Sequence, residues 1–347
     1  MKIIEPQDWF KLASPPPLLD VRSPGEYAAG HWPGARSLPL FDNDERAEVG
    51  TLYKQTSPDA AFLRGLELAG QKMRWYVEEA RRLAPEGEVA VHCWRGGQRS
   101  QSMGWLLGKS FRDVQVINGG YKALRRAGRQ YVQEFSHPFF ILSGATGSSK
   151  TKILHALQEL GETVVDLEDL ANHKGSSFGA LGEAHQPSVE QFENLLFDRF
   201  LQLNPKAPTR VWMEDESKSI GRVYIPNELW QHMTTAPLVV LDLPLEWRIA
   251  NLVEDYAKFP IGDLREAFSR IQKRLGGQHL KAALAALDKE DYVSAAHIAL
   301  RYYDKAYTLS QQKYKREVAL RWQPQANDPR LIAQELHAWT QAYQAVN

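Results

Sequence analysis

Two short apolar segments of this chain each end in a glycine-rich loop that leads directly into a helix-forming segment. The first is Val89-Ala90-Val91-His92, followed by a loop that holds Cys93; the second is Phe139-Phe140-Ile141-Leu142-Ser143, followed by residues 144–151. Strands that alternate with helices in this way form a parallel sheet with helices on its faces. Because 347 residues exceed one ordinary hydrophobic core, the sequence predicts two α/β domains, one around each loop.

The only cysteine of the chain, Cys93, has two arginines and two glycines within the six residues that follow it. Glycines free backbone N–H groups to point into a loop, and the arginines make it positive, so this loop favours a thiolate and suits a tetrahedral oxyanion. An apolar pocket for a structural cysteine would leave these charges unpaired. We therefore predict that Cys93 is a nucleophile. The anion-binding candidates around it are Arg95, Gly96, Gly97, Arg99 and Ser100.

Composition narrows the classes of protein to which the chain can belong. Its 42 Lys and Arg balance 42 Asp and Glu, which argues against a protein that coats a polyanion. Ten basic and three acidic residues between Arg81 and Arg129 nevertheless leave a local excess of +7 (10 − 3). A single cysteine excludes an internal disulfide and a cysteine-cluster metal site, and is typical of a reducing compartment. Since no apolar run approaches the roughly 18 residues of a membrane span, we expect a cytoplasmic protein with no membrane partner.

The second glycine-rich loop has the strand–loop–helix context of a phosphate-binding P-loop. Its sequence is Gly144-Ala145-Thr146-Gly147-Ser148-Ser149-Lys150-Thr151. Backbone amides of such a loop wrap phosphate oxygens, Lys150 neutralises their charge, and the Thr151 hydroxyl can hold Mg²⁺. Ser149 stands where the usual pattern has glycine, so the sequence favours diphosphate binding over ATP hydrolysis.

Polar residues follow two further predicted strands of the second half. The strand at 163–166 leads into a glycine-bearing loop that can reach over the P-loop, and the strand at 210–213 ends in carboxylates, where P-loop proteins often hold Mg²⁺ or a nucleophile. Lone histidines and charged strand ends are more often structural, and Arg222 and Arg248 fit either phosphate clamps or ion pairs. These candidates for a second site are Asn172, His173, Ser176, Ser177, Glu214, Asp215 and Arg222.

The segment from about Asp263 to Trp322 has a helical pattern. Between Arg270 and Glu317 it carries ten basic and five acidic residues, with tyrosines interleaved at positions 302, 303, 307 and 314. Basic and aromatic side chains together can bind nucleic acid by phosphate contacts and base stacking. A helical bundle packed on the sheet explains any single one of these residues more simply.

The first half resembles a rhodanese domain, an α/β fold that carries persulfide or selenium, over about residues 1–130. The resemblance rests on four segments in order: residues 20–27 (DVRSPGEY), residues 30–35 (GHWPGA), the Cys93 loop and Asn118-Gly119-Gly120. Within it, Asp20 and Arg22 are predicted to form a structural pair. The five residues between Cys93 and Arg99 also match the spacing of cysteine phosphatases, although a phosphatase needs a general acid for its leaving group.

Both halves together resemble the tRNA 2-selenouridine synthase family across essentially the whole chain. Besides the Cys93 loop, the resemblance rests on residues 170–179 (LANHKGSSFG) and the Glu-Asp-Glu-Ser segment that begins at Glu214. It implies a rhodanese-like domain over residues 1–133. It also implies a P-loop NTPase-like parallel-sheet domain with a helical C-terminal region over residues 134–347.

The same resemblance implies a transferase that acts on 2-thiouridine at the wobble position of tRNA. A geranyl group from geranyl diphosphate would first alkylate the sulfur, with the P-loop residues 144–151 binding the diphosphate and Lys150 stabilising its departure. Selenium from selenophosphate would then replace the geranylated sulfur. Cys93 would carry this selenium as a perselenide, and the anion-binding candidates named above would hold the selenophosphate. Geranyl diphosphate and selenophosphate are thus the expected co-substrates, with Mg²⁺ an option at Thr151.

Three alternatives from other classes stay open. An ATP-dependent tRNA sulfurtransferase would use a Cys93 persulfide and require ATP for turnover. A Cys-x5-Arg phosphatase would release phosphate without any need for tRNA. A non-catalytic tRNA-binding module would keep its role after Cys93→Ala.

Overall fold

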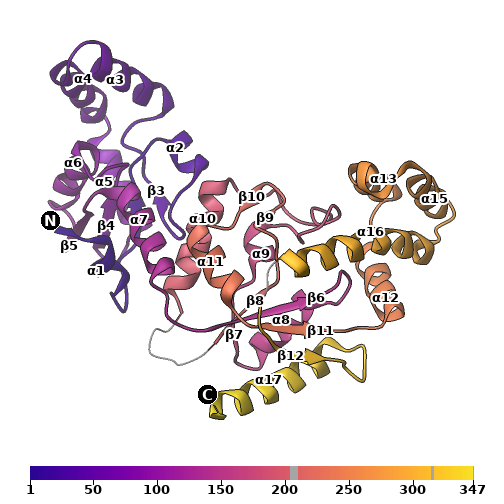
Figure 1. Ribbon diagram of the computed structural model, residues 1–347. Coiled ribbons are helices and arrows are strands. Elements are labelled where there is room, and N and C mark those ends of the chain that lie inside the picture. The colour runs from indigo at the N-terminus through magenta and orange to yellow at the C-terminus, as the bar shows by residue number, and fades with distance from the viewer. Residues whose placement is uncertain (204–209, 314–315, 347) are drawn as a thin grey trace. The chain divides into compact units, whose positions relative to one another are not determined.

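The computed structural model of the protein describes residues 1–203, 210–313 and 316–346 (Figure 1). The chain divides into two compact units. The first consists of Met1–Glu134 together with Glu193–Gln202, and the second of the remaining residues. Residues 193–201 of helix α10 (Val189–Leu201) therefore belong to the first unit, whereas the sequence placed all of this segment in the second domain.

The first unit is built on a five-stranded sheet in the order β1-β5-β4-β2-β3, in which every pair is parallel. Two of its inner strands are short and buried, except for half-buried Glu88 at the start of β4, as their apolar sequences predict. Asp20 pairs with His92 in register, so the carboxyl ends of neighbouring strands meet at one edge of the sheet. The strands are β1 (Lys2–Ile4), β2 (Leu18–Asp20), β3 (Arg36–Ser37), β4 (Glu88–His92) and β5 (Asp113–Ile117).

Seven helices before residue 134 accompany this sheet, and local capping explains where several begin. Ser23 and Glu26 form a capping box at the start of α2, Asp42 and Glu45 form another at the start of α3, and Ser57 caps α4. The helices are α1 (Pro6–Phe10), α2 (Pro24–Ala29), α3 (Asn43–Gln55), α4 (Pro58–Gly70), α5 (Met73–Leu83), α6 (Gln98–Leu107) and α7 (Gly120–Gln133).

The second unit holds another parallel sheet, in the order β12-β11-β6-β8-β7. The predicted α/β fold class is therefore confirmed. A short antiparallel hairpin turns at Gly221, which has a positive φ of 58°. The strands are β6 (Phe139–Gly144), β7 (Thr163–Val164), β8 (Val211–Glu214), β9 (Ser219–Ile220), β10 (Val223–Tyr224), β11 (Leu238–Leu241) and β12 (Val318–Trp322).

Helices of the second unit form two groups. The helices α8 and α17 pack on the sheet through Leu154, Leu157, Ile332 and Leu336, while α13 to α16 form a helical region with an apolar cluster of its own around Phe268. The helices are α8 (Lys150–Glu159), α9 (Leu167–Ala171), α11 (Asn227–Thr235), α12 (Leu245–Tyr256), α13 (Ile261–Arg270), α14 (Gln272–Leu275), α15 (Gly277–Leu287), α16 (Tyr292–Lys313) and α17 (Pro329–Val346).

The helical prediction for residues 263–322 is wrong at its end. Residues Val318–Trp322 form β12, which pairs with β11, and Leu320 and Trp322 pack against the core of the sheet. The pairing with β11 and the alternation of side chains thus make this segment a strand, although the residues before it are helical. Tyr314 lies outside the described residues. No helix within the described ranges combines the length and the apolar character needed to cross a membrane.

Candidate functional site

Cys93 follows β4 directly, and the loop after it leads into α6. Its side chain is 3% exposed, and the Ser100 hydroxyl lies 3.2 Å from its sulfur and 3.1 Å from the carbonyl oxygen of Gly97. Within the described residues, no backbone N–H of residues 94–100 finds an acceptor in a carbonyl or a side chain. The loop therefore presents a set of free donors beside the thiol, as an anion-binding cradle requires.

The turn after β5 holds the Cys93 loop in place. The backbone N–H of Tyr121 donates to the carbonyl oxygen of Cys93 at 2.8 Å. Gly120 has a φ of +60°, and a Cβ there would lie 2.3 Å from the same carbonyl oxygen; Gly96 has a φ of +67° and a Cβ there would lie 2.7 Å from the backbone nitrogen of Gly119. This close approach of two backbones explains why the segment 118–120 accompanies the cysteine loop.

The two arginines of the loop differ in their surroundings. Arg95 is exposed, and no ion pair or hydrogen bond of its guanidinium occurs within the described residues. Arg99 instead pairs with Glu26, with 2.6 Å between Nη1 and Oε2. Burial alone would raise the pKa of Glu26, but its hydrogen bond to Arg99 and the charge of Arg99 outweigh burial and lower it. This ion pair engages the arginine that a phosphatase loop needs for its phosphate and that the selenophosphate prediction also uses, so Arg95 is the loop arginine left open to an anion.

Asp20 and Arg22 form the predicted structural pair. Both are fully buried, with 2.6 Å between Arg22 Nη2 and Asp20 Oδ2, and Arg22 also donates to the carbonyl oxygen of Gly30 and lies over the ring of Tyr121. His92 stands nearby with its Nε2 3.8 Å from Asp20, and burial lowers the pKa of this imidazole. The pair ties β2 to the segment before β3, behind the Cys93 loop.

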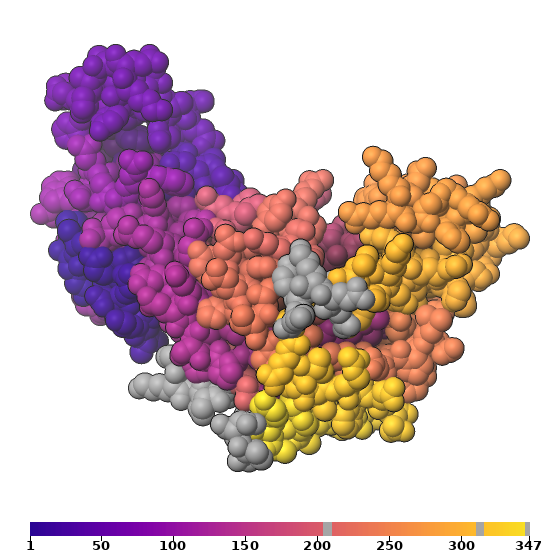
Figure 2. Space-filling view, viewed as in Figure 1, coloured from indigo at the N-terminus to yellow at the C-terminus, as the bar shows by residue number. Residues whose placement is uncertain are grey.

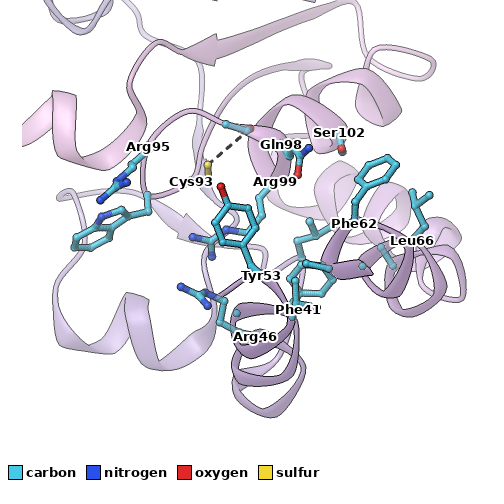
Figure 3. Close-up of a pocket in the computed structure, with 18 of the residues that line it drawn as sticks. Phe41, Arg46, Tyr53, Phe62, Leu66, Cys93, Arg95, Gln98, Arg99 and Ser102 are labelled. Atoms are coloured by element: carbon cyan, nitrogen blue, oxygen red, sulfur yellow. Dashed lines mark hydrogen bonds between the residues drawn. The ribbon is translucent and has the colours of Figure 1, made fainter. Parts of the chain in front are cut away.

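A cavity of about 560 Å³ opens in front of Cys93 and is bounded by α3 and α4 (Figure 3). Phe41, Phe62 and Leu66 line it together with Arg95 and Arg99. The sequence did not predict this cavity. The capping residues before Asn43 and Pro58 do indicate two helices, but no signal in the sequence shows that these helices face the cysteine loop.

The second loop has the conformation of a phosphate cradle. The backbone N–H groups of Gly147, Ser149 and Lys150 find no acceptor within the described residues, and the Lys150 ammonium donates to the carbonyl oxygen of Gly144 at 3.1 Å. Ser149 has a φ of +52° and a buried hydroxyl without a partner. The loop thus keeps the left-handed conformation of the usual glycine although serine occupies the position.

Helix α12 supports this loop from outside. Arg248 donates from Nε to the carbonyl oxygen of Thr146 at 2.8 Å and pairs with Asp304, and Asn251 donates to the carbonyl oxygen of Gly147 at 2.8 Å. A Cβ at Gly147 would lie 2.6 Å from the carbonyl oxygen of Arg248. Arg248 was expected to be either a phosphate clamp or one half of an ion pair, and the structure shows the ion pair.

Carboxylates crowd the start of α8, and two of them were missed by the sequence-based prediction. The Thr151 hydroxyl donates to Glu168 at 2.6 Å. Burial, followed by the charge of Glu168, raises the pKa of Glu216 to about 8, while Lys150 acts in the opposite direction. Burial and the neighbouring carboxylates raise the pKa of fully buried Glu214 well above its usual value. In the described part of the chain, no group of three or more His, Cys, Asp or Glu side chains has the arrangement of a metal site.

Four of the other candidates lie on the segment after α9. Asn172 ends this helix with a φ of +48°, and His173 is half-buried with its pKa lowered first by burial and then by Arg270. Ser176 accepts the backbone N–H of Phe178, and Ser177 donates its own to the Tyr303 hydroxyl. This segment packs against the side chain of Glu216. The contact is close at Gly175, where a Cβ would lie 2.6 Å from the Glu216 carboxylate.

The remaining two candidates have separate surroundings. Asp215 accepts the Ser143 hydroxyl at 2.6 Å and pairs with Arg316 at 2.7 Å. Arg222 is exposed on the β9–β10 hairpin, where its backbone N–H donates to Gln186. Neither contact joins these two side chains to the Glu168–Glu216 pair.

Comparison with known proteins covers both units. A rhodanese-like domain model matches residues 6–127, and a model described as the tRNA 2-selenouridine synthase AAA domain matches residues 137–263. The tRNA 2-selenouridine synthase of a Sulfurovum species is 34% identical, over 94% of this chain and 95% of its own. That of Marinobacter nauticus is also 34% identical, over 89% and 92%. The chain therefore belongs to the tRNA 2-selenouridine synthase family.

Proposed function

We propose that this protein converts 2-thiouridine at the wobble position of tRNA into 2-selenouridine in two steps. Geranyl diphosphate alkylates the sulfur, and selenium from selenophosphate then replaces the geranylated sulfur. One observation carries this proposal: the chain contains two separate loops with free backbone donors, at residues 94–100 and at the P-loop, and its single cysteine lies at the first of them. Two phosphorylated co-substrates with different chemistry require such a pair of loops.

The geranylation step is assigned to the P-loop. The thiouridine sulfur forms a bond to C1 of the geranyl group while the C1–O bond to diphosphate breaks. Lys150 and the free N–H groups of the loop stabilise the charge on the departing diphosphate. A small apolar cavity lined by Thr146, Phe178 and Phe268 offers an apolar surface for the prenyl chain next to the P-loop. At about 70 Å³ it accepts ten carbons only in part or after side-chain movement.

Alkylation of the sulfur also requires that the base lose its N3 proton. Glu216 lies beside Lys150 and Glu168, and its pKa of about 8 suits a general base near neutral pH. We assign to it the removal of this proton while the S–C bond forms. Fully buried Glu214 accepts the backbone N–H of Leu167, and burial raises its pKa well above the usual value, which fits a protonated structural group instead.

Electron counting changes the expected role of Cys93. Selenophosphate carries selenium at the level of selenide, so forming a perselenide from it would need an oxidant. A redox-neutral route fits the same residues. The Cys93 thiolate attacks C2 of the base and expels geranylthiolate, which takes a proton from water; the selenium of selenophosphate then attacks C2 and expels Cys93. Water finally cleaves the Se–P bond, which leaves its electron pair on selenium and releases phosphate.

A basic cleft in the helical region supports tRNA as the partner. Arg270, Lys273 and Arg274 line a cleft of about 440 Å³ together with Tyr302 and Tyr303, next to the segment at 175–177. These are the residue types that bind phosphates and stack on unpaired bases. We assign this cleft to the RNA.

Mass spectrometry of nucleosides tests the proposal. A 2-thiouridine tRNA is incubated with geranyl diphosphate and selenophosphate and with wild-type protein, Cys93→Ala or Lys150→Ala. We expect Cys93→Ala to give only the geranylated nucleoside and Lys150→Ala to give neither product. A chemically geranylated tRNA should restore selenouridine formation by Lys150→Ala. Full geranylation by Lys150→Ala, or selenouridine from Cys93→Ala, would contradict this division of work.

A further inference from the structure

Helices α3 and α4 present apolar side chains that their own packing leaves exposed. No residue of α3 is fully buried, and Ala61 is the one buried residue of α4. Tyr53, Phe62 and Leu66 are 62%, 42% and 52% exposed. Figure 2 shows this violet part of the chain standing out as a lobe of the first unit. Such apolar surface costs free energy in water, and a bound apolar group would cover it.

The cavity between these helices and the Cys93 loop separates charge from apolar surface. Figure 3 shows Arg95 on one side of Cys93, and Phe62 and Leu66 on the other, where Gln98 and Ser102 also lie. A molecule that reacts at this sulfur therefore meets a cationic group in one direction and, beyond the polar side chains of α6, apolar side chains in the other. This division suits an anionic donor such as selenophosphate together with an acceptor that carries an apolar chain.

We propose that the apolar side of this cavity, at Phe41, Phe62, Gly65 and Leu66, binds the geranyl chain of the alkylated tRNA base while C2 faces Cys93. The inference rests on the proposed function and adds a second prenyl site to it, separate from the P-loop. Size supports it: an apolar cavity of about 150 Å³ holds a six-carbon ring, so on the order of 250 Å³ suffices for ten carbons. The cavity of about 560 Å³ has this room.

The site also gives the geranyl group a purpose in the second step. A chain held in the cavity fixes the C–S bond that must break beside the attacking thiolate, which lowers the entropy cost of the reaction. It also selects geranylated tRNA over tRNA that still carries a free thiocarbonyl. The first modification thus acts as the recognition element for the second.

Thiol-specific reagents test the cavity without tRNA or selenium. Methyl and geranyl methanethiosulfonate both form a disulfide with a thiolate and release methanesulfinate, and Cys93 is the only thiol of the chain. Rates of labelling are measured by mass spectrometry and divided by the rates with N-acetylcysteine. We expect the geranyl reagent to label Cys93 at least tenfold faster than the methyl reagent. Equal corrected rates would overturn the proposal.

A matched pair of glycine variants locates the effect. Gly65 lines the cavity, and a Cβ there would lie 3.3 Å from Phe41 Cζ; Gly70 lies on the same helix, has no neighbour within 4 Å and does not line the cavity. Leucine raises helix propensity at either position, so both variants should fold. Gly65→Leu should remove the preference for the geranyl reagent, while Gly70→Leu keeps it. A preference that survives in Gly65→Leu would also overturn the proposal.

A final comparison separates this proposal from the proposed function. Anticodon stem-loops with chemically prepared S-geranyl- or S-methyl-2-thiouridine are supplied with selenophosphate. Wild-type protein and Gly70→Leu should prefer the geranyl substrate by at least tenfold in kcat/KM, and Gly65→Leu should lose that preference. If neither substrate reacts but the labelling preference holds, the cavity binds prenyl chains and the proposed function fails. If both substrates react equally well with wild-type protein, the function stands and the cavity proposal fails.

Discussion

The carboxylate of Glu26, in the first turn of α2, holds the guanidinium of Arg99, in the first turn of α6, with 2.6 Å between Oε2 and Nη1. Both side chains are about four-fifths buried. Glu26 also accepts the backbone N–H of Ser23 in a capping box. One carboxylate therefore joins the start of a helix near the Asp20–Arg22 pair to the start of the helix that carries the cysteine loop.

Glu26→Gln should destabilise the start of α6 by about 1–3 kcal/mol, because it leaves the partly buried Arg99 without its counter-charge. The pKa of Glu26 is lower in the folded protein than its usual 4.5. The pair therefore stabilises the fold above pH 4.5 and loses this contribution as the pH falls through the lowered pKa. Hydrogen exchange of α6 in the two proteins should differ at pH 7 and converge in acid. The exposed pair of Glu48 and Arg64 gives the control, since water screens this pair and Glu48→Gln should leave the exchange of α6 unchanged.

Gly120→Ala should distort the Cys93 loop and lower selenouridine formation at least tenfold without affecting geranylation. The new Cβ would lie 2.3 Å from the carbonyl oxygen of Cys93. Gly34→Ala is the matched control, because Gly34 also has a positive φ, 75°, but no atom within 4 Å of a Cβ. The two variants share the backbone strain, so an equal loss of nucleoside product in both would contradict the role assigned to the close approach.

Ser149→Gly should stabilise the P-loop by roughly 0.5–1 kcal/mol, because it removes the strain of a left-handed serine against a smaller entropic cost of glycine. It also removes a buried hydroxyl without a partner. Ser148→Gly should act in the opposite direction, since its hydroxyl donates to the carbonyl oxygen of Ala145 at 2.6 Å. Hydrogen exchange of residues 144–151 measures both, and a loss of protection in Ser149→Gly would show that the conformation is not strained.

Geranylation should accelerate with rising pH with a midpoint near pH 8, where Glu216 is half ionised, and level off above it. Glu216→Gln should lower its rate about 10²- to 10⁴-fold, the usual contribution of a general base. Glu168→Gln should instead shift the midpoint of the pH profile downward, because the charge of Glu168 helps to raise the pKa of Glu216. Single-turnover formation of the geranylated nucleoside measures these effects. An unchanged profile in Glu216→Gln would remove Glu216 from the proposal.

Replacing Lys273 and Arg274 together by alanine should weaken tRNA binding and reduce the slope of log affinity against log salt by about 0.7 for each lost contact with a single-stranded phosphate. Both side chains line the cleft that contains Tyr302 and Tyr303. Lys281→Ala serves as the control, since this exposed lysine of α15 does not line the cleft. Equal salt slopes for the wild type and the double variant would place the RNA elsewhere.

The sequence predicts the two loops well because each is specified locally. An apolar strand, glycines at positions of positive φ and a following helix place Cys93 and the P-loop without any knowledge of distant residues. The Asp20–Arg22 pair is also specified locally, because the two residues are only two positions apart in the sequence. The prediction for Arg99 illustrates the limit, since its partner Glu26 lies far away in sequence.

Features that depend on the packing of distant segments could not be predicted. The cavity before Cys93 requires α3 and α4 to face α6, and neither helix carries chemistry of its own. Glu168 and Glu216 differ from other acidic residues only because their surroundings bring two carboxylates together beside Lys150. The strand at Val318–Trp322 forms because β11 offers it an edge.

The return of α10 to the first unit has a consequence for biosynthesis. Asn194 donates to the Tyr121 hydroxyl at 2.7 Å, Glu193 pairs with Arg125, and Phe197 lies against Gly128. A nascent chain that has left the ribosome only as far as residue 134 therefore lacks part of the surface that covers α7. Domains usually fold in order as they emerge. The first unit, however, should complete its fold only after residue 202 has emerged. Its completion on the ribosome should accordingly lag behind the appearance of the P-loop strand.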